Sequence, residues 1–292
     1  PPAAIDNILI EAVNCGRVED IVVNLNDNEE GLSAVVSLFD DNVVEDLTYF
    51  VEYKLSNSND WITVSTNDTT LVLEDLEYSS NYSIRARVLC SETEFSEYSN
   101  EVYFSTPCGI IYDFPWEESF EQAFISESNQ IGNEYAPKCW AIINEGGDYY
   151  KWEQSSYASD GDNGIEFYGY ANSGVYNDWL ITPLINFDGN QILTFKVKKQ
   201  SASAQPKFKL YYYDATESDV TSINDTSLFE LLDMVICNYP SNNFKKMGID
   251  LSDIGGVGRI ALVVNEPTSE FYIDEFKIDN KPLCSDVFGL TV

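Results

Sequence analysis

A short hydrophobic alternation that recurs along the whole chain is the feature that most constrains its fold. In residues 49–55, 82–88 and 208–212 an apolar side chain occupies about every second position, and Asn, Asp, Ser and Gly separate such runs. A period of two places the apolar side chains of a strand on one face. Amphipathic segments with a helical period are hard to find. The pattern therefore predicts an all-β protein built from sandwiches.

Length and charge narrow the possible partners. The chain has 292 residues, enough for two domains with a core each. Its 49 acidic and 16 basic residues give a net charge of −33, which disfavours nucleic acid and anionic membranes and attracts divalent cations. No apolar run approaches the ~18 residues of a membrane-spanning helix. We expect no nucleic-acid partner, no membrane span in this fragment, and a solubilising role for most carboxylates.

The complete absence of histidine bears on catalysis. It excludes Ser-His-Asp and Cys-His catalysis, imidazole acid–base chemistry and histidine-bound zinc. Two carboxylates suffice to hydrolyse glycosides, but among 49 acidic residues some pair is always close, so a pair alone indicates little. The glycine-rich run 255–258 lacks the Lys-Ser/Thr ending of a phosphate-binding loop. We therefore expect a chain that is not an enzyme.

Six cysteines are scattered through the sequence, and none forms a Cys-x-x-Cys pair. Such spacing favours disulfides in an oxidising compartment, and buried thiols of a cytosolic protein are the alternative. The chain begins with Pro1 and carries no signal peptide at its start. We expect it to be a processed or excised part of a longer secreted protein.

Residues 15–107 resemble a fibronectin type III domain. Seven strands are predicted there, an immunoglobulin-like count: 18–25, 31–39, 48–55, 61–64, 69–73, 81–90 and 98–105. Leu73, Leu76 and Tyr82 precede an alternating strand at the place where a tyrosine corner would stand, with its ring in the core and its hydroxyl bonded to upstream backbone. In that topology Cys15 and Cys90 would meet and form a disulfide.

Residues 108–281 resemble the cleaved-adhesin and choice-of-anchor J domains, jelly rolls related to MAM domains and found in secreted surface proteins of Bacteroidetes. The resemblance rests on an ordered series of motifs: WEESFE (116–121), CW (139–140), NDWLITPLI (177–185), LTFKV (193–197), FKKMGIDLS (244–252), RIALVV (259–264) and FYIDEFKI (271–278). It implies a second, larger β-sandwich with an extracellular role in adhesion or carbohydrate contact. Cys108 and Cys139 could join the entry of this domain to its Cys-Trp segment, which would leave Cys237 as a buried thiol, but four cysteines allow three connectivities.

Two short matches between the ends of the chain suggest a repeat. Residues 5–10 resemble 273–278, and 15–23 resemble 284–292, at offsets of 268 and 269. Chance similarity between short β segments is the alternative. We expect residues 1–14 to be the last strand of a preceding unit or a linker, and 282–292 to begin a further fibronectin-like domain.

The jelly-roll resemblance implies a structural calcium ion where the first and last strands meet. The matching positions are Glu121 and Asp274, with Asp178 as a further ligand. Carboxylates and carbonyls are the ligands that calcium takes. The alternative is that each is an ordinary solvated acid, and the acidic loop 160–164 lacks the spacing of an EF-hand.

Aromatic side chains in turn-rich sequence are candidates for stacking on sugar rings. They are Tyr149, Tyr150, Trp152, Tyr168, Tyr170 and Tyr176. Packing between strands is the alternative for most of them. We expect a non-catalytic segment of a secreted, repetitive cell-surface adhesin that acts as spacer and adhesive module. Its expected partners are surface glycans, other extracellular proteins and neighbouring repeats. The alternative is a carbohydrate-binding module attached to a secreted hydrolase or peptidase.

Overall fold

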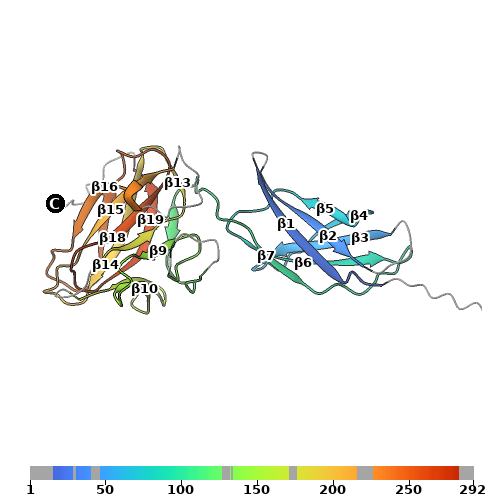
Figure 1. Cartoon of the computed structure of the whole chain (residues 1–292), viewed down its shortest axis with the longest axis horizontal. Helices are drawn as coiled ribbons and strands as arrows, with labels where there is room; N and C mark the ends of the chain where they lie inside the picture. The colour runs from blue at the N-terminus through green and yellow to red at the C-terminus, as the bar shows by residue number, and fades with distance from the viewer. Residues whose placement is uncertain are drawn as a thin grey trace, which may run out of the picture. The chain divides into compact units, whose positions relative to one another are not determined.

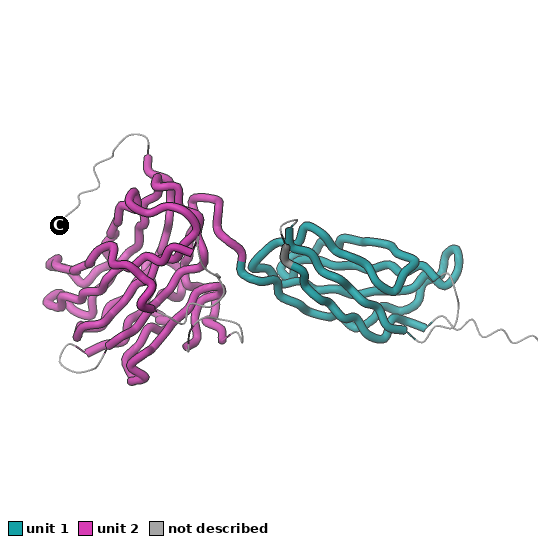
Figure 2. Tube along the Cα trace, turned by 45° about the horizontal axis from the view of Figure 1, so that its top comes forward, with its two compact units in different colours: residues 1–108 teal, residues 109–292 magenta. Residues whose placement is uncertain are grey.

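The computed structural model describes residues 16–28, 31–40, 47–126, 132, 134–170, 176–215 and 226–282. Contacts divide the chain into two compact units, Pro1–Cys108 (unit 1) and Gly109–Val292 (unit 2), coloured separately in Figure 2. All named strands pair antiparallel, and the helical content of the described residues is one 3₁₀ turn, Thr226–Leu228. The all-β prediction is confirmed. No helix in this part of the chain is long and apolar enough to cross a membrane.

Unit 1 is a sandwich of two sheets (Figure 1). One sheet has the order β1 (Asp20–Asn28), β2 (Gly31–Phe39), β5 (Thr70–Leu73), and the other has the order β4 (Ile62–Thr66), β3 (Thr48–Leu55), β6 (Asn81–Leu89), β7 (Val102–Ser105). Every second residue of β2 is buried, as the alternation predicts. Val36, Val51 and Ile84, from both sheets, are fully buried in one core.

Tyr82 occupies the position predicted for a tyrosine corner. Its side chain is buried, and its hydroxyl oxygen accepts a hydrogen bond from the backbone N–H of Glu77 at 2.9 Å. Its ring stacks on Phe104 with centroids 5.3 Å apart. The hydroxyl therefore ties the turn before β6 to the strand, while the ring fills the core.

Unit 2 is built from two six-stranded sheets. The first, sheet D, has the order β10 (Lys151–Ser155), β11 (Gly164–Tyr168), β19 (Phe271–Asn280), β14 (Gln191–Lys199), β17 (Lys245–Asp250), and β8 (Trp116–Glu118) also pairs with β19. The second, sheet C, has the order β16 (Glu230–Ile236), β15 (Lys207–Asp214), β18 (Gly256–Val264), β12 (Asp178–Ile181), β9 (Ala141–Asn144), and β13 (Ile185–Phe187) also pairs with β18.

The core between these sheets is rich in aromatic rings. Trp140, Trp152, Phe195, Phe208 and Phe276 are among its largest fully buried side chains. Phe276 contacts Trp140 edge-to-face at 5.0 Å, and Phe195 lies 5.9 Å from Phe208 on the opposite sheet. Such pairs add about 0.5–1.5 kcal/mol each to the burial of their area.

The other face of sheet C is also covered. A second cluster there contains Trp179, Ile181, Phe229, Ala261 and Val263. Because both faces of β12 and β18 are buried, apolar side chains occupy consecutive positions, 179–181 and 260–264, rather than every second one.

Three cysteines in the described part of the chain, Cys90, Cys108 and Cys139, are disulfide-bonded. Cys237 is a fully buried free thiol, as expected from the sequence. Cys15 lies outside the described residues, as do the predicted flanking segments 1–14 and 282–292 apart from residue 282.

Candidate functional site

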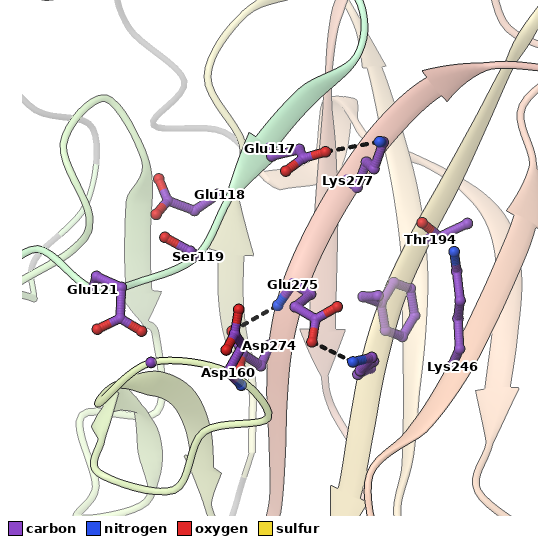
Figure 3. A pocket seen from close by; sticks show the side chains of 13 residues that line it. Glu117, Glu118, Ser119, Glu121, Asp160, Thr194, Lys246, Asp274, Glu275 and Lys277 are labelled. Carbon is purple, nitrogen blue, oxygen red and sulfur yellow. Dashed lines mark hydrogen bonds and ion pairs between the residues drawn. The ribbon is translucent and has the colours of Figure 1, made fainter.

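Unit 2 carries a pocket of about 480 Å³ on the outer side of sheet D. Most of its lining side chains are charged: Glu117, Glu118, Glu121, Asp160, Asp274, Glu275, Lys196, Lys246 and Lys277. Figure 3 shows Glu118, Ser119 and Glu121 on the segment that leaves β8, opposite Asp274 and Glu275 on β19. The pocket therefore lies where the first and last strands of unit 2 meet, and both Glu121 and Asp274 line it.

A β-bulge in β19 creates this pocket. On one edge β19 pairs with β11 through Phe271–Ile273 and with β8 through Phe276–Ile278, which leaves a gap at Asp274 and Glu275. On the other edge the register with β14 shifts at the same place, and Glu275 has a left-handed φ of 51°. The extra residue turns two consecutive side chains toward the pocket.

Asp274 anchors the loop that closes one side of the pocket. Its side chain is 1% exposed. Oδ2 accepts the backbone N–H groups of Ser159 and Asp160 at 2.6 and 3.1 Å, and Oδ1 accepts that of Glu275 at 2.6 Å. Burial raises the pKa of Asp274 above its ordinary value, and the three N–H groups offset only part of that rise.

Glu121 holds the other end of the same loop. Its carboxylate accepts the backbone N–H groups of Asp162 at 3.1 Å and Asn163 at 3.3 Å. Gly161, between the anchors, has a φ of +69°, and a Cβ there would stand 2.0 Å from Oε1 of Glu121. Glycine is therefore required for the carboxylate to approach this closely.

Lysines pair with two of the other acids that line the pocket. Lys196 forms an ion pair with Glu275, and Lys277 pairs with Glu117 at 2.7 Å. The sequence pattern does not indicate Glu275, Lys196 or Lys277 as residues of the site. The bulge that positions them depends on pairing with β8, β11 and β14, and no local pattern indicates it.

The lone pairs that remain on Asp274 and Glu121 decide how a calcium ion could bind there. A carboxylate offers about four lone pairs. Three of them on Asp274 and two on Glu121 already accept N–H groups. A cation would therefore share both carboxylates with the loop. Within the described ranges no three Asp, Glu, Cys or His side chains gather closely enough to form a metal centre by themselves.

Asp178 lies elsewhere, at the start of β12 in sheet C, and does not line this pocket. Its side chain is 1% exposed, and neither carboxylate oxygen has a hydrogen-bond partner. Burial raises its pKa to about 7, Asp148 adds to the rise, and the backbone N–H of Asn177 offsets part of it. The structure thus brings Glu121 and Asp274 together and separates Asp178 from both.

A tyrosine cluster lies on the side of unit 2 near Asp178. It comprises Tyr149, Tyr150, Tyr168, Tyr170 and Tyr176. Tyr149 meets Tyr168 edge-to-face at 5.4 Å, Tyr168 stacks on Tyr150 at 6.0 Å, and Tyr150 meets Tyr176 at 5.5 Å. The hydroxyl of Tyr176 donates to the carbonyl of Tyr170 and accepts its N–H.

One tyrosine of the cluster is buried against the core, and two others are largely exposed to solvent. Tyr176 is buried and contacts Phe167 of the core at 5.5 Å, whereas Tyr149 is 77% and Tyr170 57% exposed. Trp152, the remaining aromatic candidate from this region, is 1% exposed and belongs to the core. Its position on β10 opposite Phe167 of β11 decides this, and the sequence alone leaves both possibilities open.

Known proteins offer the following similarities. No protein-family model matches the sequence, and no curated protein matches it. Among solved structures, the K1 cleaved adhesin domain of Lys-gingipain from Porphyromonas gingivalis W83 is similar, with 19% identity, a TM-score of 0.44, and coverage of 58% of this chain and all of that domain. The K2 domain of Lys-gingipain has 14% identity, covers 56% and 98% of the two chains, and has a TM-score of 0.42. The K3 domain has 18% identity, the same coverage, and a TM-score of 0.39.

Proposed function

We propose that this chain is a non-catalytic adhesive segment of a secreted cell-surface protein, and that it contacts neutral glycans through the tyrosine cluster. The observation that carries the proposal is the cluster itself, in which exposed rings are held by buried ones. Tyr149 presents most of its ring to solvent, while Tyr176 ties the group to the core. Aromatic rings that are already fixed lose little conformational entropy on binding.

The charges around the cluster favour a neutral sugar. Glu153 and Glu270 act electrostatically on Tyr168, and Asp148 acts on Tyr176. Carboxylates accept strong hydrogen bonds from hydroxyl groups, and the apolar C–H face of a sugar ring packs on an aromatic face. A sulfated or sialylated glycan would be repelled by these acids and by the net charge of −33.

Glycan binding by the full chain tests this proposal. Tyr149→Ala and Tyr168→Ala should each weaken binding to a neutral glycan about tenfold or more, because they remove central rings of the contact. The measurement is a glycan array followed by calorimetry. Tyr103→Ala is the matched control, since Tyr103 is 70% exposed but lies in unit 1. Failure of every neutral glycan to bind, or an equal loss in the control, would contradict the proposal.

The tyrosine cluster equally suits the alternative, a carbohydrate-binding module attached to a secreted hydrolase or peptidase. The complete open reading frame separates the two. Further copies of the same two units would favour a repetitive adhesin, in which this segment is also a spacer between neighbouring repeats. A catalytic domain would favour the module.

Calcium at Glu121 and Asp274 is part of the proposal as a structural ion. It would bind the lone pairs that the loop 159–163 leaves open and so fix the loop against β19. Its contribution is stabilisation of unit 2, since a ligand of the folded state adds about 2.7 kcal/mol when present at 100 times its dissociation constant.

A further inference from the structure

Asp178 is a buried acid, and no neighbouring side chain stabilises its carboxylate. Its side chain is 1% exposed, and both carboxylate oxygens lack a hydrogen-bond partner. It shares the inner face of β12 with Leu180, which belongs to the main core, whereas Trp179 and Ile181 belong to the cluster on the other face. A native structure that buries an unsatisfied polar group requires an explanation, such as a bound ion.

The donors around Asp178 are directed at other acceptors. Trp152 Nε1 donates to the backbone carbonyl of Asp178, at 3.3 Å, rather than to its carboxylate. Asn144, opposite Asp178 in the pairing of β9 with β12, donates Nδ2 to the carbonyl of Asp148. Tyr176 donates its hydroxyl to Tyr170. None of these three donors bonds the carboxylate oxygens, and the backbone N–H of the preceding residue, Asn177, offsets only part of the rise in the pKa of Asp178.

The charged neighbours are also of the wrong sign to compensate a carboxylate. Asp148 and Glu134 are the acids that act on Asp178. The nearby Lys151 is paired with Glu134 at 2.7 Å, and in the described part of the chain no lysine or arginine pairs with Asp178. Leaving a buried charge uncompensated costs several kcal/mol.

A bound cation would compensate the buried carboxylate of Asp178 more completely than protonation would. Protonation would remove the charge, but it would leave one donor and one acceptor buried without partners. A divalent ion binds both oxygens at once and offsets the negative charge of Asp148 as well. The available donors are oxygens, which suits a hard cation, and calcium accepts irregular sets of about six to eight oxygens.

We propose that Asp178 and Asp148 hold a calcium ion at the base of the tyrosine cluster, at a site distinct from Glu121 and Asp274. The ion would join β12 to the loop after β9, which contains Asp148 and Tyr149. The site therefore fixes the loop that presents the exposed ring of Tyr149. The proposal of a calcium site does not depend on glycan binding, because the ion needs no sugar ligand.

Terbium luminescence in the full chain tests the site. Terbium replaces calcium at oxygen sites, and the indole of Trp152 contacts Asp178 closely enough to sensitise it. At pH 7.5 we expect sensitised luminescence that calcium displaces, a loss of most of that signal in Asp178→Asn, and retention of it in Glu121→Gln. An equal signal in Asp178→Asn, or no sensitised signal in the wild type at millimolar terbium, would overturn the proposal.

A second variant, Asp148→Asn, keeps the site testable if Asp178→Asn does not fold. Asp148 lies on a partly exposed loop, so Asp148→Asn should fold even if Asp178→Asn does not. It should weaken calcium affinity about tenfold or more, since it removes one of two carboxylates. Unchanged affinity in Asp148→Asn would refute its part in the site. Glycan binding, measured separately, reports on the tyrosine cluster alone.

Discussion

Glu52 of unit 1 accepts hydrogen bonds from two other side chains. Its Oε2 accepts Nε and Nη2 of Arg85 at 2.9 and 2.7 Å, and its Oε1 accepts the hydroxyl of Tyr98 at 2.7 Å. The guanidinium of Arg85 also lies 4.1 Å from the ring centroids of both Trp61 and Tyr98. One carboxylate thus orients a stack of aromatic and cationic side chains on the outer face of β3 and β6.

The pKa of Glu52 predicts how this contact depends on pH. Burial raises the pKa, but the bonds from Tyr98 and Arg85 outweigh it, and the pKa lies below its ordinary value of 4.5. A depressed pKa stabilises the fold above that ordinary value, and the contribution is lost as the pH falls through the folded-state pKa. Glu52→Gln should lower the free energy of unfolding by about 2 kcal/mol at pH 7.

Hydrogen exchange of the β3 and β6 amides in the full chain measures this loss. The difference between wild type and Glu52→Gln should shrink as the pH falls below 4.5, because the wild type then loses the same charge. Glu101→Gln, which affects only an exposed bond to Tyr103, is the control. A loss of equal size at pH 3 and pH 7 would disprove the electrostatic account.

At the scale of one element, β18 depends on glycine for close packing. A Cβ on Gly258 would stand 2.4 Å from the carbonyl oxygen of Tyr213 and 2.4 Å from the ring of Tyr212 on the neighbouring strand β15. Gly255, three residues earlier, is different, because a Cβ there would meet only the carbonyl of Phe187 at 3.8 Å. The two glycines therefore have different roles within one short run.

Alanine substitutions separate these roles. Gly258→Ala should destabilise unit 2 by about 3 kcal/mol, since a rigid strand and a buried ring must move to admit the methyl group. Gly255→Ala should change stability by less than about 1 kcal/mol. Thermal unfolding of the full chain compares them, and equal melting temperatures for the two variants would show that the strands adjust freely.

At the scale of the whole molecule, the two units have separate cores. The buried residues of unit 1 form one cluster, and those of unit 2 form two others that share no residue with it. Because burial of apolar area is the main stabilising term, each unit should unfold in its own transition. Both proposed calcium sites belong to unit 2.

Chelation should therefore act on one transition only. In calorimetry of the full chain, excess EDTA should lower the melting temperature of unit 2 by several degrees and leave that of unit 1 unchanged. Added calcium should restore the transition. If both transitions are insensitive to EDTA, no structural calcium contributes to this fold.

The sequence by itself determined the class of the fold and much of unit 1. Period-two alternation is local, so it locates strands such as β2 and β3 to the residue. The pattern of Leu73, Leu76 and Tyr82 predicts that the Tyr82 hydroxyl bonds upstream backbone, and the structure gives the donor as the N–H of Glu77. The sequence also placed Glu121 and Asp274 at one meeting of strands, through resemblance rather than periodicity.

Only the tertiary structure decided what surrounds each candidate residue. The gap between β8 and β11 sets the bulge at Glu275, the pairing of β10 with β11 buries Trp152, and the ring contacts join tyrosines from separate loops. The isolation of the Asp178 carboxylate depends on where Trp152, Asn144 and Tyr176 direct their donors. Such arrangements join residues far apart in the chain, so no local pattern contains them.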